Sequence, residues 1–83
     1  DLFLTCTQVW AGPLSGGAFV VVLWNLDIQQ ANMEATFADI GIAAGVTCSV
    51  RDLWQHTWVA NATGRVRATV PSHDVVALKL VPL

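Results

Sequence analysis

Acidic side chains are the first candidates for chemistry, because two carboxyl groups about 5–5.5 Å apart can serve as a nucleophile and a general acid–base pair. The chain has six of them: Asp1, Asp27, Glu34, Asp39, Asp52 and Asp74. Glu34 lies in a segment of alternating polar and apolar residues. Asp27, Asp39 and Asp74 lie in turn-like segments, where an aspartate accepts hydrogen bonds from the nearby backbone. Because no spacing brings two carboxyl groups together, we assign no catalytic residue.

The histidines and the glycine-rich segment give no stronger signal. His56 and His73 lack the neighbouring Cys, His or Glu ligands that a zinc site needs. Ser72-His73-Asp74 has the residue types of a nucleophile relay, but neighbours in an extended chain point in opposite directions, so we expect no relay. The segment 12–17 has no Lys after its last glycine and therefore does not match a phosphate-binding loop. We predict no metal and no cofactor.

The cysteines and one short motif are candidates for covalent modification. Cys6 and Cys48 are not spaced like a zinc or redox motif. We interpret them as small buried apolar side chains. A disulfide between them is the alternative, and it requires Cα atoms about 4.4–6.8 Å apart. Asn61-Ala62-Thr63 is an N-glycosylation motif, which we place in a loop because Gly64 follows it.

Four tryptophans are many for 83 residues. An indole ring suits a core, a protein interface or the face of a sugar. Trp24 ends an apolar run, so we expect it to be buried. Trp54 and Trp58 are expected around a loop. We interpret Trp10, Trp54 and Trp58 as contacts with another domain. A place in the core and sugar binding are the alternatives.

The elements that would position these residues are β-strands. Polar and apolar residues alternate over 31–37, 46–51 and 65–70, which is typical of half-buried antiparallel strands. The segments 5–10 and 75–81 are apolar and rich in β-branched residues. Turn residues separate these segments at intervals of about 8–12 residues. The sequence therefore predicts one all-β domain over 1–83, an antiparallel Greek-key β-sandwich of seven to eight strands.

The composition indicates that another surface covers this domain. Hydrophobic residues make up 54% of the chain and charged residues only 12%, against about 25% charged in average domains. The segment 18–24 is apolar on both faces, although an antiparallel sheet usually leaves one face to water. The chain begins with Asp, which we interpret as a fragment of a larger protein. The net charge of −2 without a basic run argues against nucleic acid. No apolar run reaches the about 20 residues of a membrane helix.

Several segments together resemble a known family. They are Val9–Gly16 (VWAGPLSG), Val21–Asn25 (VVLWN), Asp39–Gly41 (DIG), Arg51–Trp54 (RDLW) and Ser72–Asp74 (SHD). In this order and spacing they resemble the C-terminal domain of melibiase-type α-galactosidases, glycoside hydrolase family 27. The resemblance covers nearly the whole chain.

This resemblance implies a two-domain retaining enzyme, in which a (β/α)8 barrel carries two catalytic Asp residues and a β-sandwich follows. No position of this chain matches either catalytic motif. The chain is then the non-catalytic sandwich that packs against and stabilises the barrel, and the parent enzyme hydrolyses terminal α-galactosidic bonds. We expect such a parent to be secreted, in the cell wall, or vacuolar or lysosomal. A stand-alone galactose-binding module, with Trp54 and Trp58 as sugar contacts, is the alternative.

Overall fold

The computed structural model describes residues 7–43 and 45–83, and their regular secondary structure is mostly β-strand. A short 3-10 turn, Ser15–Gly17, joins the first two strands, and one helical turn, α1 (Phe37–Ile40), follows the third. The strands are β1 (Thr7–Pro13), β2 (Phe19–Asn25), β3 (Ala31–Thr36), β4 (Thr47–Asp52), β5 (Thr57–Thr63), β6 (Arg65–Val70) and β7 (Asp74–Pro82).

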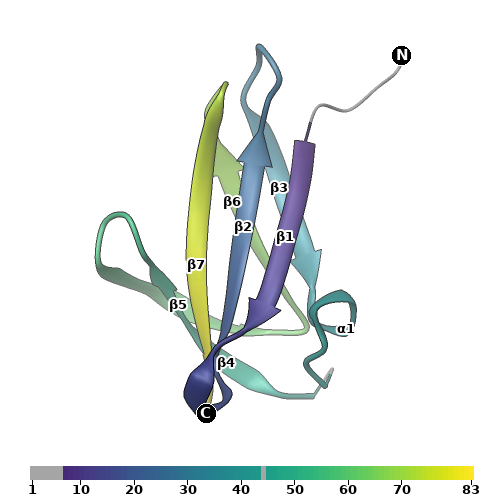
Figure 1. Ribbon diagram of the computed structural model, residues 1–83, viewed down its shortest axis with the longest axis vertical. Coiled ribbons are helices and arrows are strands. Elements are labelled where there is room, and N and C mark those ends of the chain that lie inside the picture. The colour runs from purple at the N-terminus through teal and green to yellow at the C-terminus, as the bar shows by residue number, and fades with distance from the viewer. Residues whose placement is uncertain (1–6, 44) are drawn as a thin grey trace.

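The strands form two antiparallel sheets. One sheet has five strands in the order β1-β2-β7-β4-β5, and the other pairs β3 with β6. In Figure 1 the pair β3–β6 lies behind β1, β2 and β7. The β4–β5 hairpin is flanked in the sequence by β3 and β6, so the chain crosses between the sheets on both sides of it, as in Greek-key sandwiches. The predicted all-β sandwich is confirmed.

One strand was missed by the sequence prediction. β5 occupies the segment that we expected to be a loop, and it forms an edge of the five-stranded sheet beside β4. Its residues are nearly all exposed, and a bulge shifts its register so that Val50 faces Ala60 while Arg51 faces Trp58. The bulge and the lack of large core-facing side chains erase the alternation that marks the other strands. Trp58 and Asn61 therefore lie in a strand.

The core fills the space between the two sheets. Val21, Leu23 and Leu80 of the larger sheet are fully buried against Val70 of the smaller one. Phe37, the first residue of α1, is also fully buried. This helical turn begins at Thr36, whose Oγ1 accepts a hydrogen bond from the Asp39 N–H, and ends at Gly41, which has a φ of 90°. The strands β2, β3, β6 and β7 thus form the packed centre that carries the surfaces described below.

Asn25 is a fully buried polar side chain at the end of β2. Its Nδ2 group donates to the carbonyl oxygens of Gln29, Val70 and Pro71 at 2.8, 3.0 and 3.2 Å. Its Oδ1 accepts from the Asp27 N–H at 2.9 Å. One amide thereby joins the β2–β3 connection to the β6–β7 connection, which pass between the sheets at the same end of the sandwich.

Candidate functional site

The outward face of the five-stranded sheet is apolar over three adjacent strands. Directly paired residues of antiparallel strands share a face, so Trp10 of β1 lies beside Val22 of β2, and Trp24 lies beside Val75 of β7. Trp10 is 60% exposed and Trp24 is 40% exposed. We call this surface the outer apolar face; it consists of Trp10, Val20, Val22, Trp24, Val75, Ala77 and Val81.

The expectation that Trp24 is buried was wrong. Trp24 belongs to the doubly apolar strand, in which successive side chains point to opposite faces. Val21 and Leu23 point inward and are buried, whereas Trp24 points outward. No described segment lies over the outward side, which is why the indole is exposed. The predicted need for a cover on this strand therefore applies to its outer face.

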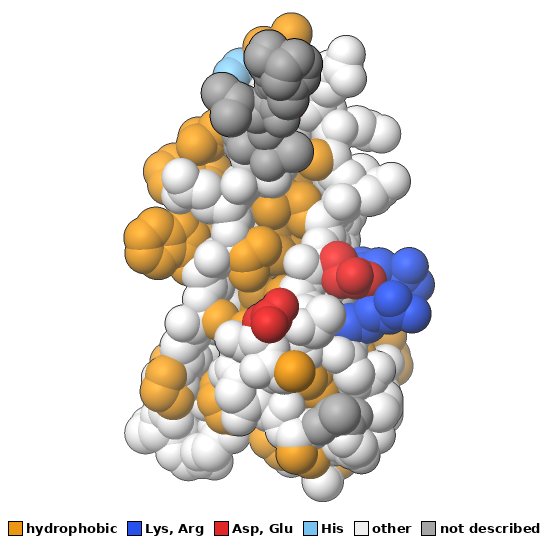
Figure 2. Space-filling model, turned by 90° about the vertical axis from the view of Figure 1, so that its right-hand side faces the viewer, with side chains coloured by type: hydrophobic (Ala, Val, Ile, Leu, Met, Phe, Trp, Pro, Cys, Tyr) orange, Lys and Arg blue, Asp and Glu red, His pale blue; other side chains and the backbone are white. Residues whose placement is uncertain are grey.

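The opposite outside surface of the sandwich, on β3 and β6, is polar. Glu34 Oε1 lies 3.3 Å from Arg65 Nη1 and 4.0 Å from Arg67 Nε. Thr69 Oγ1 donates a hydrogen bond to Asn32 Oδ1 at 2.8 Å. In Figure 2, which views the sandwich from one edge, the basic side chains and one acidic side chain lie on the right, and hydrophobic side chains project on the left. Only one of the two outer surfaces thus has the composition of a protein interface.

The Arg51–Trp54 segment shapes the turn between β4 and β5. Arg51 Nη2 donates to the His56 carbonyl at 3.0 Å, and Asp52 Oδ1 accepts from the N–H groups of Trp54 and Gln55 at 2.9 and 3.0 Å. His56 takes a positive φ of 55° within this turn. These polar side chains organise backbone, and as a result they present Trp54, which is 65% exposed, at the tip.

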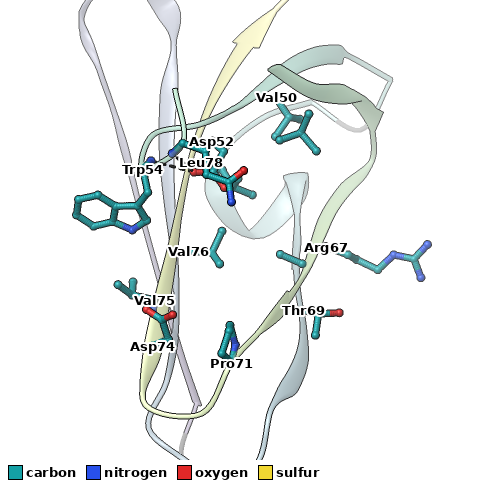
Figure 3. A pocket seen from close by; sticks show the side chains of 13 residues that line it. Val50, Asp52, Trp54, Arg67, Thr69, Pro71, Asp74, Val75, Val76 and Leu78 are labelled. Atoms are coloured by element: carbon teal, nitrogen blue, oxygen red, sulfur yellow. Dashed lines mark hydrogen bonds between the residues drawn. The ribbon is translucent and has the colours of Figure 1, made fainter. Parts of the chain in front are cut away.

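A groove of about 680 Å³ lies beside this turn, between the two sheets. Val50, Val76 and Leu78 are among its lining residues, and Asp52 and Asp74 lie at its margin (Figure 3). Both carboxylates already accept backbone N–H groups. Trp54, Gln55, Arg67 and Thr69 also line the groove, so its lining mixes apolar, polar and aromatic side chains.

The Ser72 and His73 side chains approach each other, contrary to expectation. His73 has a φ of 54°, which turns the chain and brings its Nδ1 to 3.1 Å from Ser72 Oγ. The Ser72 hydroxyl donates its one proton to the Asp27 carbonyl at 2.8 Å, so Nδ1–H is the donor to Oγ. Asp74 instead accepts the Val75 N–H. The contact therefore ties a loop together and is not a proton relay.

The remaining candidates lie on separate elements. Asn61 is exposed on β5, and its side chain shares the outward sheet face with Ser49, the residue it pairs with. Cys48 is fully buried in the core, and this burial raises the pKa of its thiol. Cys6, its predicted partner, lies outside the described residues. Over 7–43 and 45–83, no three His, Cys, Asp or Glu side chains gather as a metal site, and no helix is long and apolar enough to span a membrane.

An antiparallel sandwich with one uncovered apolar sheet face has the features of a domain that packs against another surface. The family model described as the alpha galactosidase C-terminal beta sandwich domain matches residues 5–80. The chain belongs to this family.

Full-length relatives are much longer than this chain. It is 45% identical over 78 residues to α-galactosidase 3 of Arabidopsis thaliana, an alignment that covers 93% of this chain and 18% of the relative. It is 44% identical over 75 residues to an α-galactosidase of Oryza sativa subsp. japonica, covering 90% and 18%. The crystal structure of α-galactosidase I from Mortierella vinacea superposes with a TM-score of 0.85 at 31% identity, covering 90% of this chain and 20% of that one.

These likenesses confirm the sequence-based interpretation of a non-catalytic domain of the glycoside hydrolase family 27 type. They do not favour the stand-alone galactose-binding module. A family 27 β-L-arabinopyranosidase from Geobacillus stearothermophilus superposes with a TM-score of 0.86 at 19% identity, which shows the same fold.

Proposed function

We propose that this chain completes a larger α-galactosidase-type glycoside hydrolase by packing against its (β/α)8 catalytic barrel. In this proposal the parent enzyme hydrolyses terminal α-galactosidic bonds, and the sandwich stabilises the barrel without touching the substrate. The observation that carries the proposal is the outer apolar face, opposite a polar outer surface on β3 and β6. The names of the curated relatives support the activity.

The stabilisation expected from such packing is large for a small domain. Complete burial of the exposed parts of Trp10 and Trp24 would remove roughly 200 Å² of apolar surface, which corresponds to about 5 kcal/mol. Val22 pairs with Trp10, and Val75 pairs with Trp24, so both valines add to the same contact. Without a partner this surface would remain in water, which favours self-association.

The experiment uses a chimera in which this chain replaces the matching segment of Arabidopsis α-galactosidase 3. The double variant Trp10→Ser/Trp24→Ser is compared with Asn32→Ala/Thr69→Ala, a double variant on the polar outer surface of β3 and β6. We measure the midpoint of thermal inactivation on an aryl α-galactoside, together with kcat/KM at low temperature. The double variant should inactivate at a midpoint several degrees lower, while kcat/KM stays unchanged in both. Equal midpoints for the two variants would contradict the packing.

We also propose that the parent enzyme passes through a secretory pathway, to the outside of the cell, the cell wall or a vacuole or lysosome. The exposed motif at Asn61 supports this route, because Asn61 lies on the edge strand β5, at the opposite edge of the sheet from Trp10 of β1. Expressed in a secreting eukaryotic host, the chimera should lose mass on treatment with a peptide N-glycosidase. The matched variant Asn61→Gln should lose less by the mass of one glycan. Equal losses would show that Asn61 carries none.

A further inference from the structure

We propose that the barrel surface covering the five-stranded sheet carries an Asp or Glu carboxylate that lies against Arg51 and Lys79. This inference rests on the proposed function and adds the chemistry of the partner surface. It comes from two cations that face each other on the docking side of the sheet.

The register places both cations in one row across the sheet. Val20 of β2 pairs with Lys79 of β7, Lys79 pairs with Arg51 of β4, and Arg51 pairs with Trp58 of β5. Directly paired residues share a face, and Val20 belongs to the outer apolar face. Arg51 and Lys79 therefore lie side by side on the outward surface, with a valine on one flank and a tryptophan on the other.

The described part of the chain gives these cations no anion. Its two ion pairs, Glu34 with Arg65 and with Arg67, are both on the opposite side of the sandwich. Among the described residues, the Arg51 side chain donates one hydrogen bond, to the His56 carbonyl. Like charges directly opposite each other on paired strands are destabilising, so the isolated sheet keeps an unfavourable pair.

The position of the pair within the surface favours a partner carboxylate on docking. Trp58 is 61% exposed and Val81, two residues beyond Lys79 on the same face of β7, is 37% exposed. A partner that covers both flanks also removes water from Arg51 and Lys79. Unpaired cations cost far more in such a contact than they do in water. One carboxylate between them would accept hydrogen bonds from the guanidinium and from the ammonium group.

The experiment uses the full-length chimera described above and first asks whether Lys79 is covered. Lys79 is the only lysine of the 83 residues, so acetylation of this segment by an N-hydroxysuccinimide ester reports on it directly by mass spectrometry. Slow acetylation in the folded enzyme, with full acetylation after unfolding, means that the sheet face is docked. Acetylation as fast as that of surface lysines would refute the docking and this inference together.

The second measurement asks whether a carboxylate lies opposite. Arg51→Met/Lys79→Met keeps much of the side-chain length and removes both charges, and Arg65→Met/Arg67→Met is the matched control on the other side. If a partner carboxylate lies there, the first variant strands it without a cation, and the melting temperature of the chimera falls well beyond the control. The fall is also several degrees larger than in the 83-residue chain alone, where the variant loses only the Arg51–His56 hydrogen bond. Lys79→Arg keeps the charge, so its melting temperature should fall only slightly. With Lys79 covered, an unchanged or higher melting temperature in Arg51→Met/Lys79→Met would overturn the inference while leaving the docking intact.

Discussion

Replacement of Asn25 by Ala should destabilise the domain more than any other single polar substitution in its described part. The side chain is fully buried and holds two connections together. Its two N–H donors are shared among the Gln29, Val70 and Pro71 carbonyls, and its Oδ1 accepts from the Asp27 N–H. The two Nδ2 hydrogens and Oδ1 each take part in hydrogen bonding. At about 1 kcal/mol for each of these three groups, the loss in the free energy of unfolding is about 3 kcal/mol. In a domain of this size that corresponds to roughly 12–24 °C in melting temperature.

The assay is urea unfolding of the 83-residue chain, monitored by tryptophan fluorescence. Asn32→Ala is the matched control, because Asn32 is exposed and only accepts a hydrogen bond from Thr69 on the polar outer surface. The control should change the free energy of unfolding by about 0.5 kcal/mol or less. If Asn25→Ala costs no more than Asn32→Ala, the carbonyls of the two connections are reached by water, and the assigned role of Asn25 is refuted.

Three further changes test the core and the turns. Phe37→Ala should cost about 3–5 kcal/mol in the free energy of unfolding, because the ring is fully buried and leaves a cavity; a loss below about 1 kcal/mol would mean that the core collapses around it. Gly41→Ala should lower the free energy of unfolding by about 1 kcal/mol, since Gly41 has a φ of 90°. Gly12→Ala should be nearly neutral, because Gly12 has neither a positive φ nor a close neighbour. Equal losses in the two variants would refute this. Burial raises the folded-state pKa of the Cys48 thiol above its unfolded value, so under reducing conditions its contribution is fully present below the ordinary thiol pKa and is lost as the pH rises above it. Between pH 7 and pH 10 the free energy of unfolding should fall more in the unsubstituted 83-residue chain than in Cys48→Ala. Parallel plots of the free energy of unfolding against pH would contradict the prediction.

Strands with a buried side were predictable from the sequence. β3, β4 and β6 place one set of alternating residues in the core, so their polarity pattern records the geometry. β5 leaves almost no such record, because it is an edge strand with a bulge and exposed side chains. The position of Asn61 was therefore misjudged as a loop.

The candidate surface was predictable only in part. An apolar run on both faces indicated a covering surface, but it could not show which face of β2 is inside, and Trp24 was misplaced for that reason. The Ser72–His73 contact depends on a positive φ at a histidine, which few non-glycine residues adopt. The Arg51–Lys79 row depends on pairing strands far apart in the chain, and no local pattern reports that register.

The most direct test of the central claim is hydroxyl-radical footprinting of the full-length chimera, read residue by residue by mass spectrometry. Trp10 is 60% exposed in this domain, so it should be oxidised readily when the domain is alone. If the outer apolar face packs against the barrel, Trp10 is oxidised much more slowly in the intact enzyme than in the domain alone. Equal oxidation of Trp10 in the two forms would contradict the account.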